Sequence, residues 1–557
     1  MTSASILLTV FLALAADGPP RVGMEFAVAG PAKTADDPAF DLAVGDLLAV
    51  RSVAADHCQV LSSDLERVVK IPTVWLGGRD AIPLKEAMDL YTGLIDKNPQ
   101  SKWHRRRGLV RHANQELEKA MEDWQAAIAL DPRDHRAHVG ESFAHRQLKQ
   151  FEAAIAAATK ALEIKPDFPA AWNERAQGHI GLLKWAEALA DLDKYVELAK
   201  SPVAYRARGS FRLARRDLFK AREDFTQALT LDPRDVTALH LRGQVEYWTQ
   251  NNEAALADYS RAIELSPRYW PPYFDRALVH LRKQASDQAI RDLDVVISLA
   301  PTQVAAYQNR AVANINLNQL DAAVADLRKA LELVPQNLAL LHQIASLHAR
   351  GEKWREQAQA LGELVEREPN QLAHRLHRAQ AWRMARETEN ALADLTFVAA
   401  QAPPAERQRA LVARSDYHLE LGNVQQALDD CETSLADASS LDDPAAALAL
   451  IQRAWIRATA AEEKYRDGRQ AILDATRACA AAGWNDYHRL AVLAAANAEA
   501  GRFDDAVIWQ KMAIEKLAAL PAQQRLLLVR GFDHEMATMQ ARLKTFEARQ
   551  PLRMPPP

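Results

Sequence analysis

The chain has 557 residues, a length that corresponds to about three or four conventional domains. Hydrophobic residues make up 48% and charged residues 25%, which are ordinary fractions for folded protein and exclude disorder throughout the chain. The 69 Lys and Arg residues against 73 Asp and Glu residues give a net charge of −4, so no global positive field exists to attract nucleic acid or anionic lipid. We therefore expect no nucleic-acid partner. Three widely separated cysteines also argue against a disulfide framework and against a thiolate zinc site.

The chain opens on an apolar run at residues 6–15, which ends in an Ala-Leu-Ala sequence typical of signal-peptide cleavage sites. The run is too short to span a bilayer, because a spanning helix needs about 20 apolar residues. We expect residues 1–16 to be a signal peptide and the protein to be exported, either periplasmic or secreted. Because no Lys or Arg precedes the run, a stray apolar terminus on a cytoplasmic protein is the alternative. No later segment is long and apolar enough to predict an integral membrane span.

Residues 24–82 differ in composition from the rest of the chain. Short β-rich runs separated by turn-forming residues lie at residues 47–53, 57–61, 68–71 and 73–76. Several short strands within one small segment predict a small β-barrel. The sequence VGDLLAVRSV, followed by CQVLSS and VWLGGRDAIPL, resembles bacterial SH3-like domains, which implies binding of peptides or of the cell wall. An inert barrel that caps the following segment is the alternative, and Cys58 is interpreted as a small core residue rather than a nucleophile.

From residue 84 onward the sequence repeats with a period of 34 residues. The period is marked by prolines, at Pro99, Pro132, Pro166, Pro233, Pro267, Pro301, Pro335, Pro369 and Pro403. When this proline is numbered position 32, position 8 is always Gly, Ala or Ser, and position 20 is Ala in every repeat except one, which has Gln357. Each repeat is expected to form two helices of about 12–14 residues, because proline cannot continue the second helix. Small side chains at positions 8 and 20 allow the two helices to cross closely.

A larger side chain at position 24, such as Trp124, Phe225 or Tyr259, is expected to fill the space beside these small residues. The 34-residue pattern of small and aromatic residues resembles the tetratricopeptide repeat (TPR) family over residues 84–520, with a leading helix at 84–98 and about twelve repeats. The resemblance implies an all-α solenoid, a TPR superhelix of stacked helical hairpins, behind the small β-barrel. Residues 521–557 are expected to form a capping helix, at 522–548, and a tail. The extra residues near 462–467 are interpreted as a bend or as a loop that contacts a partner.

Positions 7 and 23 of the repeats vary together. Where position 7 is Arg, the second helix of the same repeat carries an Asp, and the three repeats that have Glu141, Ile344 or Leu493 instead of Arg also lack the Asp. We therefore predict nine ion pairs that each join the two helices of one repeat. The alternative, a track of arginines that binds anions or nucleic acid, is disfavoured because each Arg has a neutralising partner. The pairs are Arg107–Asp123, Arg175–Asp191, Arg208–Asp224, Arg242–Asp258, Arg276–Asp292, Arg310–Asp326, Arg378–Asp394, Arg414–Asp430 and Arg453–Asp474.

The sequence contains no nucleotide-binding, zinc-protease or serine-hydrolase motif, so we expect neither an enzyme nor a cofactor. His135 with His138, and His374 with His377, have a spacing that can hold a metal on a helix. Neither pair has a Cys or carboxylate that completes a site, so solvated or packed histidines are expected and no metal is assigned.

The family resemblance implies a peptide-binding surface, because positions 2, 5, 9 and 12 of the first helices line the concave groove of TPR proteins. The early repeats place basic residues at these positions and the middle repeats place apolar ones, namely Lys102, Arg105, His112, Arg136, Arg146, Tyr247, Phe274, Leu278, Leu281, Val312 and Ile315. This pattern suits an extended or helical peptide with acidic and hydrophobic anchors. A groove filled by the chain's own termini or by solvent alone is the alternative. The family's clamp of Lys and Asn residues for a peptide carboxylate is not recognisable.

Taken together, these patterns predict a non-enzymatic scaffold or adaptor that binds a partner protein or peptide along its concave face. The alternative function is a cell-envelope module, in which the SH3-like domain contacts the wall polymer and the solenoid acts as a spacer.

Overall fold

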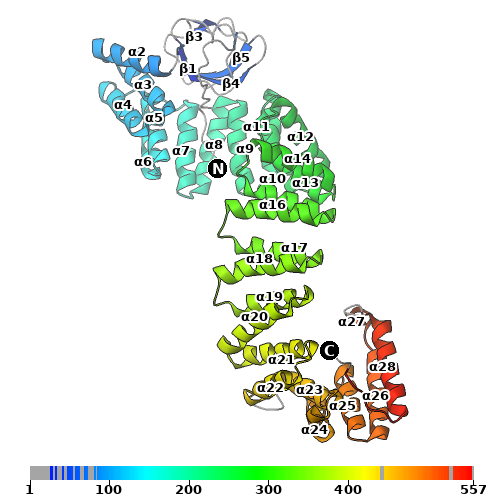
Figure 1. Ribbon diagram of the computed structural model, residues 1–557. Coiled ribbons are helices and arrows are strands. Elements are labelled where there is room, and N and C mark those ends of the chain that lie inside the picture. Colours follow the sequence, from blue (N-terminus) through cyan, green and yellow to red (C-terminus); the bar gives the residue numbers. More distant parts are fainter. Residues whose placement is uncertain are drawn as a thin grey trace. The chain divides into compact units, whose positions relative to one another are not determined.

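The computed structural model describes residues 84–438, 444–525, 528 and 531–554, together with seven short strands between residues 25 and 82 (Figure 1). Side chains are described from residue 88 onward. The chain divides into an N-terminal unit, residues 1–300, and a C-terminal unit, residues 301–557. The expected signal peptide, residues 1–16, lies outside the described residues.

The strands of the N-terminal unit lie within residues 24–82. They are β1 (Glu25–Val28), β2 (Ala32–Lys33), β3 (Asp41–Leu42), β4 (Leu47–Val53), β5 (His57–Ser62), β6 (Val68–Pro72) and β7 (Ala81–Ile82). Five of them form an antiparallel sheet in the order β6-β5-β4-β1-β7, and β2 pairs with β3. Val50 lies opposite Val60, and the register shifts between Val50 and Ser52. The runs expected at 47–53, 57–61 and 68–71 fall on β4, β5 and β6, whereas the run at 73–76 and the side chain of Cys58 lie outside the described residues. An SH3-like barrel stays a prediction.

Helix α2 (Leu84–Lys97) is followed by antiparallel helical hairpins, six in each unit, in which odd-numbered helices come first and even-numbered helices second. The hairpins of the N-terminal unit are α3 (Ser101–Ala113) with α4 (Leu117–Leu130), α5 (His135–Gln147) with α6 (Phe151–Ile164), α7 (Pro169–Gly181) with α8 (Trp185–Ala199), α9 (Pro202–Ala214) with α10 (Leu218–Leu231), α11 (Val236–Trp248) with α12 (Asn252–Leu265), and α13 (Pro271–Arg282) with α14 (Ser286–Leu299).

The hairpins of the C-terminal unit are α15 (Val304–Asn316) with α16 (Leu320–Leu333), α17 (Leu338–Arg350) with α18 (Trp354–Arg367), α19 (Leu372–Met384) with α20 (Thr388–Gln401), α21 (Pro404–Glu420) with α22 (Val424–Ala436), α23 (Pro444–Thr459) with α24 (Gly468–Ala481), and α25 (Tyr487–Glu499) with α26 (Phe503–Ala518). Within each unit, every helix of the hairpins packs against the next hairpin helix along the chain. The all-helical repeat architecture expected from the 34-residue period is therefore present in both units.

The recurrent proline ends the second helix of each repeat that contains it, as expected. Helix α4 ends at Leu130, two residues before Pro132, and α16 ends at Leu333, two residues before Pro335. The third repeat lacks this proline, and there α8 continues to Ala199 and closes on Lys200, which has a left-handed φ of 44°. A left-handed residue at the end of a helix lets backbone N–H groups reach the last free carbonyls.

A left-handed residue also joins the two helices at position 15 of every described hairpin except α23–α24, which carries the extra residues near 462–467. Leu183 has φ 59° and Gln284 has φ 59°, while Gly422 and Gly501 occupy the same place in later repeats. In the first hairpin this turn allows the N–H of Glu116 to bond the carbonyl of Arg111 at 2.8 Å. The short turn between helices is thus fixed by backbone hydrogen bonds.

The helices of a hairpin cross where positions 8, 20 and 24 meet. Gly108, Gly209 and Gly243 occupy position 8 in the repeats whose position 24 is aromatic, whereas Ala277 faces Leu293 at these positions. A Cβ atom on Gly243 would lie 2.5 Å from Tyr259 Cε1, and one on Gly108 would lie 2.7 Å from Trp124 Nε1. In these repeats the residue at position 8 is therefore glycine beside an aromatic residue at position 24 and alanine beside leucine.

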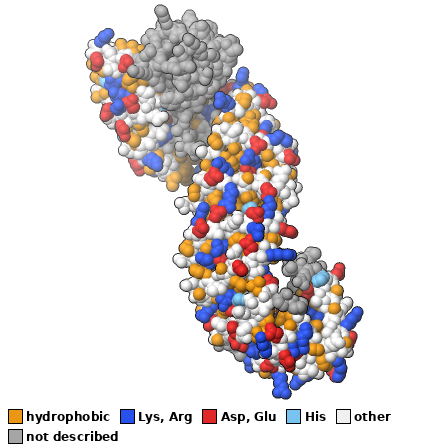
Figure 2. Space-filling view, viewed as in Figure 1, with side chains coloured by type: hydrophobic (Ala, Val, Ile, Leu, Met, Phe, Trp, Pro, Cys, Tyr) orange, Lys and Arg blue, Asp and Glu red, His pale blue; other side chains and the backbone are white. Residues whose placement is uncertain are grey.

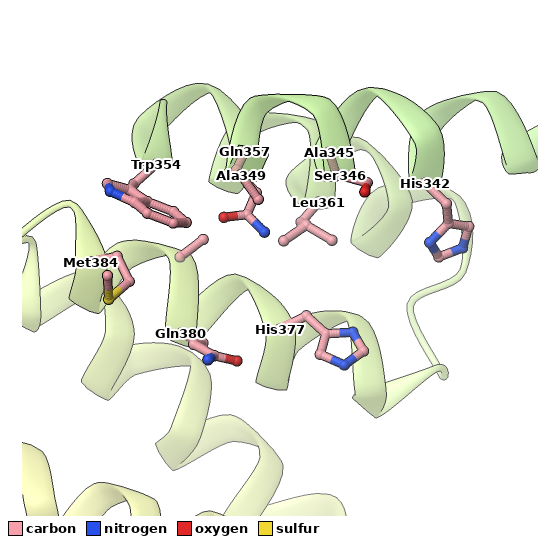
Figure 3. A pocket seen from close by; sticks show the side chains of 11 residues that line it. His342, Ala345, Ser346, Ala349, Trp354, Gln357, Leu361, His377, Gln380 and Met384 are labelled. Atoms are coloured by element: carbon pink, nitrogen blue, oxygen red, sulfur yellow. The ribbon is translucent and has the colours of Figure 1, made fainter. Parts of the chain in front are cut away.

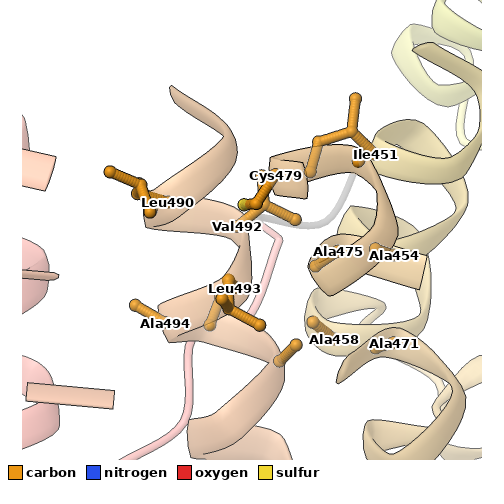
Figure 4. Close-up of a cluster of buried hydrophobic side chains, with 14 of the residues drawn as sticks. Ile451, Ala454, Ala458, Ala471, Ala475, Cys479, Leu490, Val492, Leu493 and Ala494 are labelled. Carbon is orange, nitrogen blue, oxygen red and sulfur yellow. The ribbon is translucent and has the colours of Figure 1, made fainter. Parts of the chain in front are cut away.

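A large buried cluster in the C-terminal unit joins α23, α24, α25, α26 and α28 (Phe532–Glu547) (Figure 4). It contains many alanines, such as Ala454 and Ala471, together with Leu490, Leu493 and Cys479. Because alanine side chains are short, the helices of this cluster approach closely.

The single helix expected at 522–548 is wrong. The structure has the short α27 (Ala522–Arg525) and the separate α28 (Phe532–Glu547), and Gly531 before α28 has φ 80°, which an α-helix does not accommodate. Helix α28 is also not simply polar, because Met539 and Phe546 are fully buried against the preceding hairpin. The Nε2 of Gln510 on α26 donates to the carbonyl of Met539 at 2.9 Å.

The extra residues near 462–467 form a short 3-10 helix, η1 (Glu463–Tyr465). Arg466 donates from Nε to Glu499 at 3.0 Å and from Nη1 to the carbonyl of Ala461 at 2.7 Å. The backbone N–H of Met554 bonds the carbonyl of Thr459 at 2.7 Å. The insertion is therefore held against the C-terminal unit by the chain's own residues.

Candidate functional site

The predicted Arg–Asp pairs are confirmed in all nine repeats named above. The shortest distance between a guanidinium nitrogen and a carboxylate oxygen is 2.5–2.8 Å in each pair. In the third repeat, Arg175 Nε and Nη2 bond the two oxygens of Asp191 at 2.9 and 2.7 Å, a two-pronged geometry that holds both side chains. The aspartates are buried, so these arginines are committed to joining the two helices of a hairpin.

The repeats without the pair replace it with apolar packing or local polar contacts. Ile344 and Ala360 are fully buried between α17 and α18, and Leu493 is buried on α25. Glu141 on α5 instead lies near two histidines on its own helix, His138 and His145. The absence of Arg and Asp from the same repeats therefore avoids an unpaired buried charge.

The basic candidates Lys102, Arg105 and His112 lie on α3, and Arg136 and Arg146 lie on α5. Arg146 Nε bonds Glu174 on α7 at 2.9 Å, and Arg105 Nε lies 3.4 Å from Asp134. Arg146 is therefore neutralised by a carboxylate of the following repeat, and Arg105 by Asp134, the residue before α5. The positive surface expected from the sequence is smaller than the count of basic residues suggests. Figure 2 shows acidic and basic side chains interspersed over the visible face.

His112 packs edge-to-face on Phe143, with ring centroids 4.6 Å apart. Burial, and after it the charge of Arg146, lowers the pKa of His112 to about 4. The imidazole is therefore neutral near physiological pH and acts as an aromatic contact between α3 and α5.

The apolar candidates occupy three first helices, with Tyr247 on α11, Phe274, Leu278 and Leu281 on α13, and Val312 and Ile315 on α15. The guanidinium of Arg282 stacks on the Tyr247 ring at 3.5 Å, and Phe274 packs edge-to-face on Trp270 at 6.4 Å. Val312 is 46% exposed. Tyr247, Phe274, Leu278 and Leu281 lie in the N-terminal unit, whereas Val312 and Ile315 lie in the C-terminal unit.

A pocket of about 430 Å³ lies between α17, α18 and α19 of the C-terminal unit (Figure 3). Of the residues around it, His377 is one of the histidines considered above as metal ligands, and none belongs to the peptide-binding surface expected from the sequence. The lining residues are His342, Ala345, Ser346, Ala349, Trp354, Gln357, Leu361, His377, Gln380, Ala381 and Met384. The one signal in the sequence was Gln357, the exception to alanine at position 20. The hollow arises because Ser346 and Ala349 are small at positions 9 and 12, where the preceding repeat has Val312 and Ile315.

The histidines considered as metal ligands make other contacts. His374 Nε2 lies 2.8 Å from a carboxylate oxygen of Glu368, and His135 packs edge-to-face on Phe168. Among the described residues, no group of three or more His, Cys, Asp or Glu side chains is arranged to hold a metal ion. Cys431 and Cys479 are buried, and burial raises the pKa of each thiol to about 12, so neither is a thiolate near neutral pH.

In the part of the chain that the structure describes, no helix has the length and apolar character needed to cross a membrane.

Two family models of the tetratricopeptide repeat match this chain. One matches residues 304–337 in the C-terminal unit, and the other matches residues 113–169 and 206–269 in the N-terminal unit. The first match coincides with the hairpin of α15 and α16 together with the proline that follows it.

A curated relative is human Tetratricopeptide repeat protein 13, which is 31% identical over 96 residues. The match covers 17% of this chain and spans only 11% of the human protein.

Solved structures similar to parts of the chain include YrrB, described as a TPR protein with an unusual peptide-binding site, at 23% identity, with 34% of this chain and 98% of that chain covered and a TM-score of 0.30. PilF of Pseudomonas aeruginosa is 16% identical, with 39% of this chain and 100% of that chain covered and a TM-score of 0.35. The assignment of the repeats rests on the family models and on the chain's own 34-residue geometry. The chain carries tetratricopeptide repeats in both of its units.

Proposed function

We propose that this protein is a non-enzymatic scaffold that binds a partner protein or peptide on the face formed by the first helices of its repeats. Tetratricopeptide repeats generally mediate protein–protein interactions. The observation that carries the proposal here is the exposure of apolar and hydrogen-bonding side chains on successive first helices of the C-terminal unit, from Val312 on α15 to Ser346 on α17 and Gln380 on α19.

The second helices use their polar residues differently. Asp258, Asp326 and their equivalents form ion pairs with the arginines of the same repeat, so they are not available to a partner. Arg242 and Arg310 on the first helices are used in the same pairs, so a partner contacts the other side chains of those helices. A partner that lies along them meets apolar side chains and uncharged polar groups rather than a charged track.

The test uses the full chain with a photo-crosslinking amino acid, p-benzoylphenylalanine, at one of two positions. Val312 is 46% exposed on the first helix α15, and Leu473 is 57% exposed on the second helix α24. We expect illumination in cells to give discrete cross-linked partners from position 312 and none from position 473. Equal cross-linking from both positions, or none from position 312, would overturn the proposed binding face.

The experiment also separates the cell-envelope alternative. If the full chain sediments with purified cell wall and position 312 captures no protein, the module at residues 24–82 is the binding part and the scaffold proposal fails. Export through residues 1–16 is a separate proposal, and its test is the compartment in which the tagged full chain accumulates after cell fractionation.

A further inference from the structure

The pocket between α17, α18 and α19 has a buried floor and an exposed rim. Ala345, Leu361 and Ala381 form the buried floor. Figure 3 shows Trp354 and Met384 at one end and His342 and His377 at the other, with Gln357 and Gln380 between them. Its volume of about 430 Å³ lies within the range of pockets that bind small organic groups.

The lining contains no Lys, Arg, Asp or Glu, although a quarter of the whole chain is charged. The nearby charges are already paired, since Arg378 bonds Asp394 and Glu368 bonds His374. Partial desolvation, and after it the neighbouring imidazole of His374, lowers the pKa of His342, which keeps that ring neutral. A charged occupant would lose its hydration here without gaining an opposite charge, so the pocket selects a neutral one.

Two carboxamides supply the polar chemistry of the pocket. Gln357 is half-buried and Gln380 is exposed, and no described residue hydrogen-bonds either amide. Each carboxamide offers two donors and one acceptor, the same groups that pair with the N–H and C=O of a peptide backbone. The apolar walls complement this polar part. The Met384 sulfur and the Trp354 ring are the kinds of group that pack favourably on aromatic rings.

We propose that this pocket binds an aromatic side chain from an uncharged, extended segment of the partner, while Gln357 and Gln380 hydrogen-bond the adjoining peptide backbone. This inference rests on the proposed scaffold function and names the chemistry of the segment that the C-terminal unit recognises. It also requires an internal segment of the partner, because a terminal carboxylate or ammonium group would meet no counter-charge in the pocket.

The pocket can be filled with residues that another repeat of this chain has at the same positions. Ser346→Val with Ala349→Ile gives the eighth repeat the residues that the seventh has at these positions, Val312 and Ile315. Gln357→Ala restores the alanine found at position 20 of the other repeats and removes the carboxamide together with the Cγ methylene. Ala322→Ile, at an exposed position of α16, makes the same change outside the pocket that Ala349→Ile makes inside it and serves as the matched control.

The experiment measures saturation-transfer NMR signals of small neutral probes with the full chain. N-acetyl-tyrosinamide and N-acetyl-phenylalaninamide are the aromatic probes, and N-acetyl-alaninamide is the probe without a ring. We expect the aromatic probes alone to bind, the Ser346→Val/Ala349→Ile variant to lose their signal, and the Ala322→Ile control to keep it. Gln357→Ala should weaken probe binding about fivefold, the effect of losing about one hydrogen bond. Circular dichroism and thermal melting establish that each variant is folded.

Retention of the aromatic signal by the filled variant, or equal binding of N-acetyl-alaninamide, would overturn the proposal. Should the filled variant fail to fold, Gln357→Ala decides the question, because unchanged probe binding in that variant contradicts the role of the carboxamide. The two proposals fail separately. Cross-linking from position 312 without pocket binding removes only this inference, whereas pocket binding without any cross-linked partner removes the scaffold function.

Discussion

The most regular feature at the scale of single residues is the bond between an arginine on a first helix and a buried aspartate on the second. In the fifth repeat Arg242 Nε and Nη2 bond the two oxygens of Asp258 at 2.8 and 2.7 Å, and Asp258 is 6% exposed. Burying the two charges removes them from water, so the pair adds little net stability compared with apolar residues of similar size. Removal of only one member of the pair strongly destabilises the protein, because the remaining charge stays buried without a partner.

This asymmetry predicts the result of a double-mutant cycle. Arg242→Ile should destabilise the protein by about 3 kcal/mol, because it leaves Asp258 without its cation. Adding Asp258→Ala reproduces the Ile344–Ala360 combination of the eighth repeat and should recover most of that loss. Urea unfolding of the wild type, both single variants and the double variant measures the coupling. Additive effects of the two single substitutions would show that the two side chains do not depend on each other.

His112 predicts a dependence of stability on pH. Its pKa is about 4 in the folded protein against an ordinary value of 6.5, so the unfolded chain binds the proton more tightly. Stability from this site is therefore lost as the pH falls from 6.5 toward 4, and the loss near pH 5 is about 1–2 kcal/mol.

The measurement compares urea unfolding midpoints of the wild type and His112→Gln at about pH 7 and about pH 5. The wild type should lose more stability on acidification than the variant, since the other histidines contribute equally to both proteins. Equal losses would contradict the assignment of this pH dependence to His112.

At the scale of helices, the two members of a hairpin are matched in size where they cross. Glycine at position 8 accompanies an aromatic residue at position 24, whereas Ala277 accompanies Leu293 and Ala311 accompanies Leu327. The aromatic rings of Phe225 and Tyr259 are buried directly against the glycine backbone. Gly with an aromatic residue and Ala with Leu are thus two combinations of side chains that allow a close crossing.

Gly243→Ala is predicted to destabilise the fifth repeat by about 1–3 kcal/mol, because overpacking forces neighbouring side chains to move. The added Cβ would lie 2.5 Å from Tyr259 Cε1. Adding Tyr259→Leu converts the crossing to the Ala–Leu combination and should restore part of the loss. Thermal unfolding of the two single variants and the double variant tests this, and a double variant less stable than both single variants would refute the size matching.

At the scale of the whole molecule, stability is expected to be local, because each repeat contacts mainly its neighbours along the chain. The final hairpin of the C-terminal unit is covered by α28, whose Phe546 is fully buried. In the N-terminal unit Phe225 is fully buried between its own repeat and the next. Damage to one of these sites should therefore remain within its own unit.

Phe546→Ala is predicted to destabilise the end of the C-terminal unit by about 3–5 kcal/mol, the cost of a large cavity. Amide hydrogen exchange should accelerate in α25, α26 and α28 and stay unchanged in α9, α10 and α11. Phe225→Ala serves as the matched control and should give the reverse pattern. Faster exchange in both units from either substitution would show that the chain unfolds as one cooperative body.

The repeated hairpin and the Arg–Asp pairs could be predicted from the sequence alone, because both depend on contacts within about thirty residues that recur at a constant spacing. The covariation of Arg378 with Asp394, and of Ile344 with Ala360, was sufficient to predict which side chains touch. The break before α28 was not predicted, since the periodic pattern ends there and Gly531 sets a local conformation that composition does not reveal.

The contacts of the first-helix residues depend on how the hairpins pack on one another. The sequence alone presents Arg105 and Arg146 as free positive charges, whereas the folded chain places Asp134, before α5, and Glu174, on α7, beside them. The pocket around Gln357 likewise needs three helices from two repeats. Its volume depends on the small side chains that leave space between those helices. A periodic sequence specifies contacts inside a repeat, whereas the surface between repeats is set by the packing of one hairpin on the next.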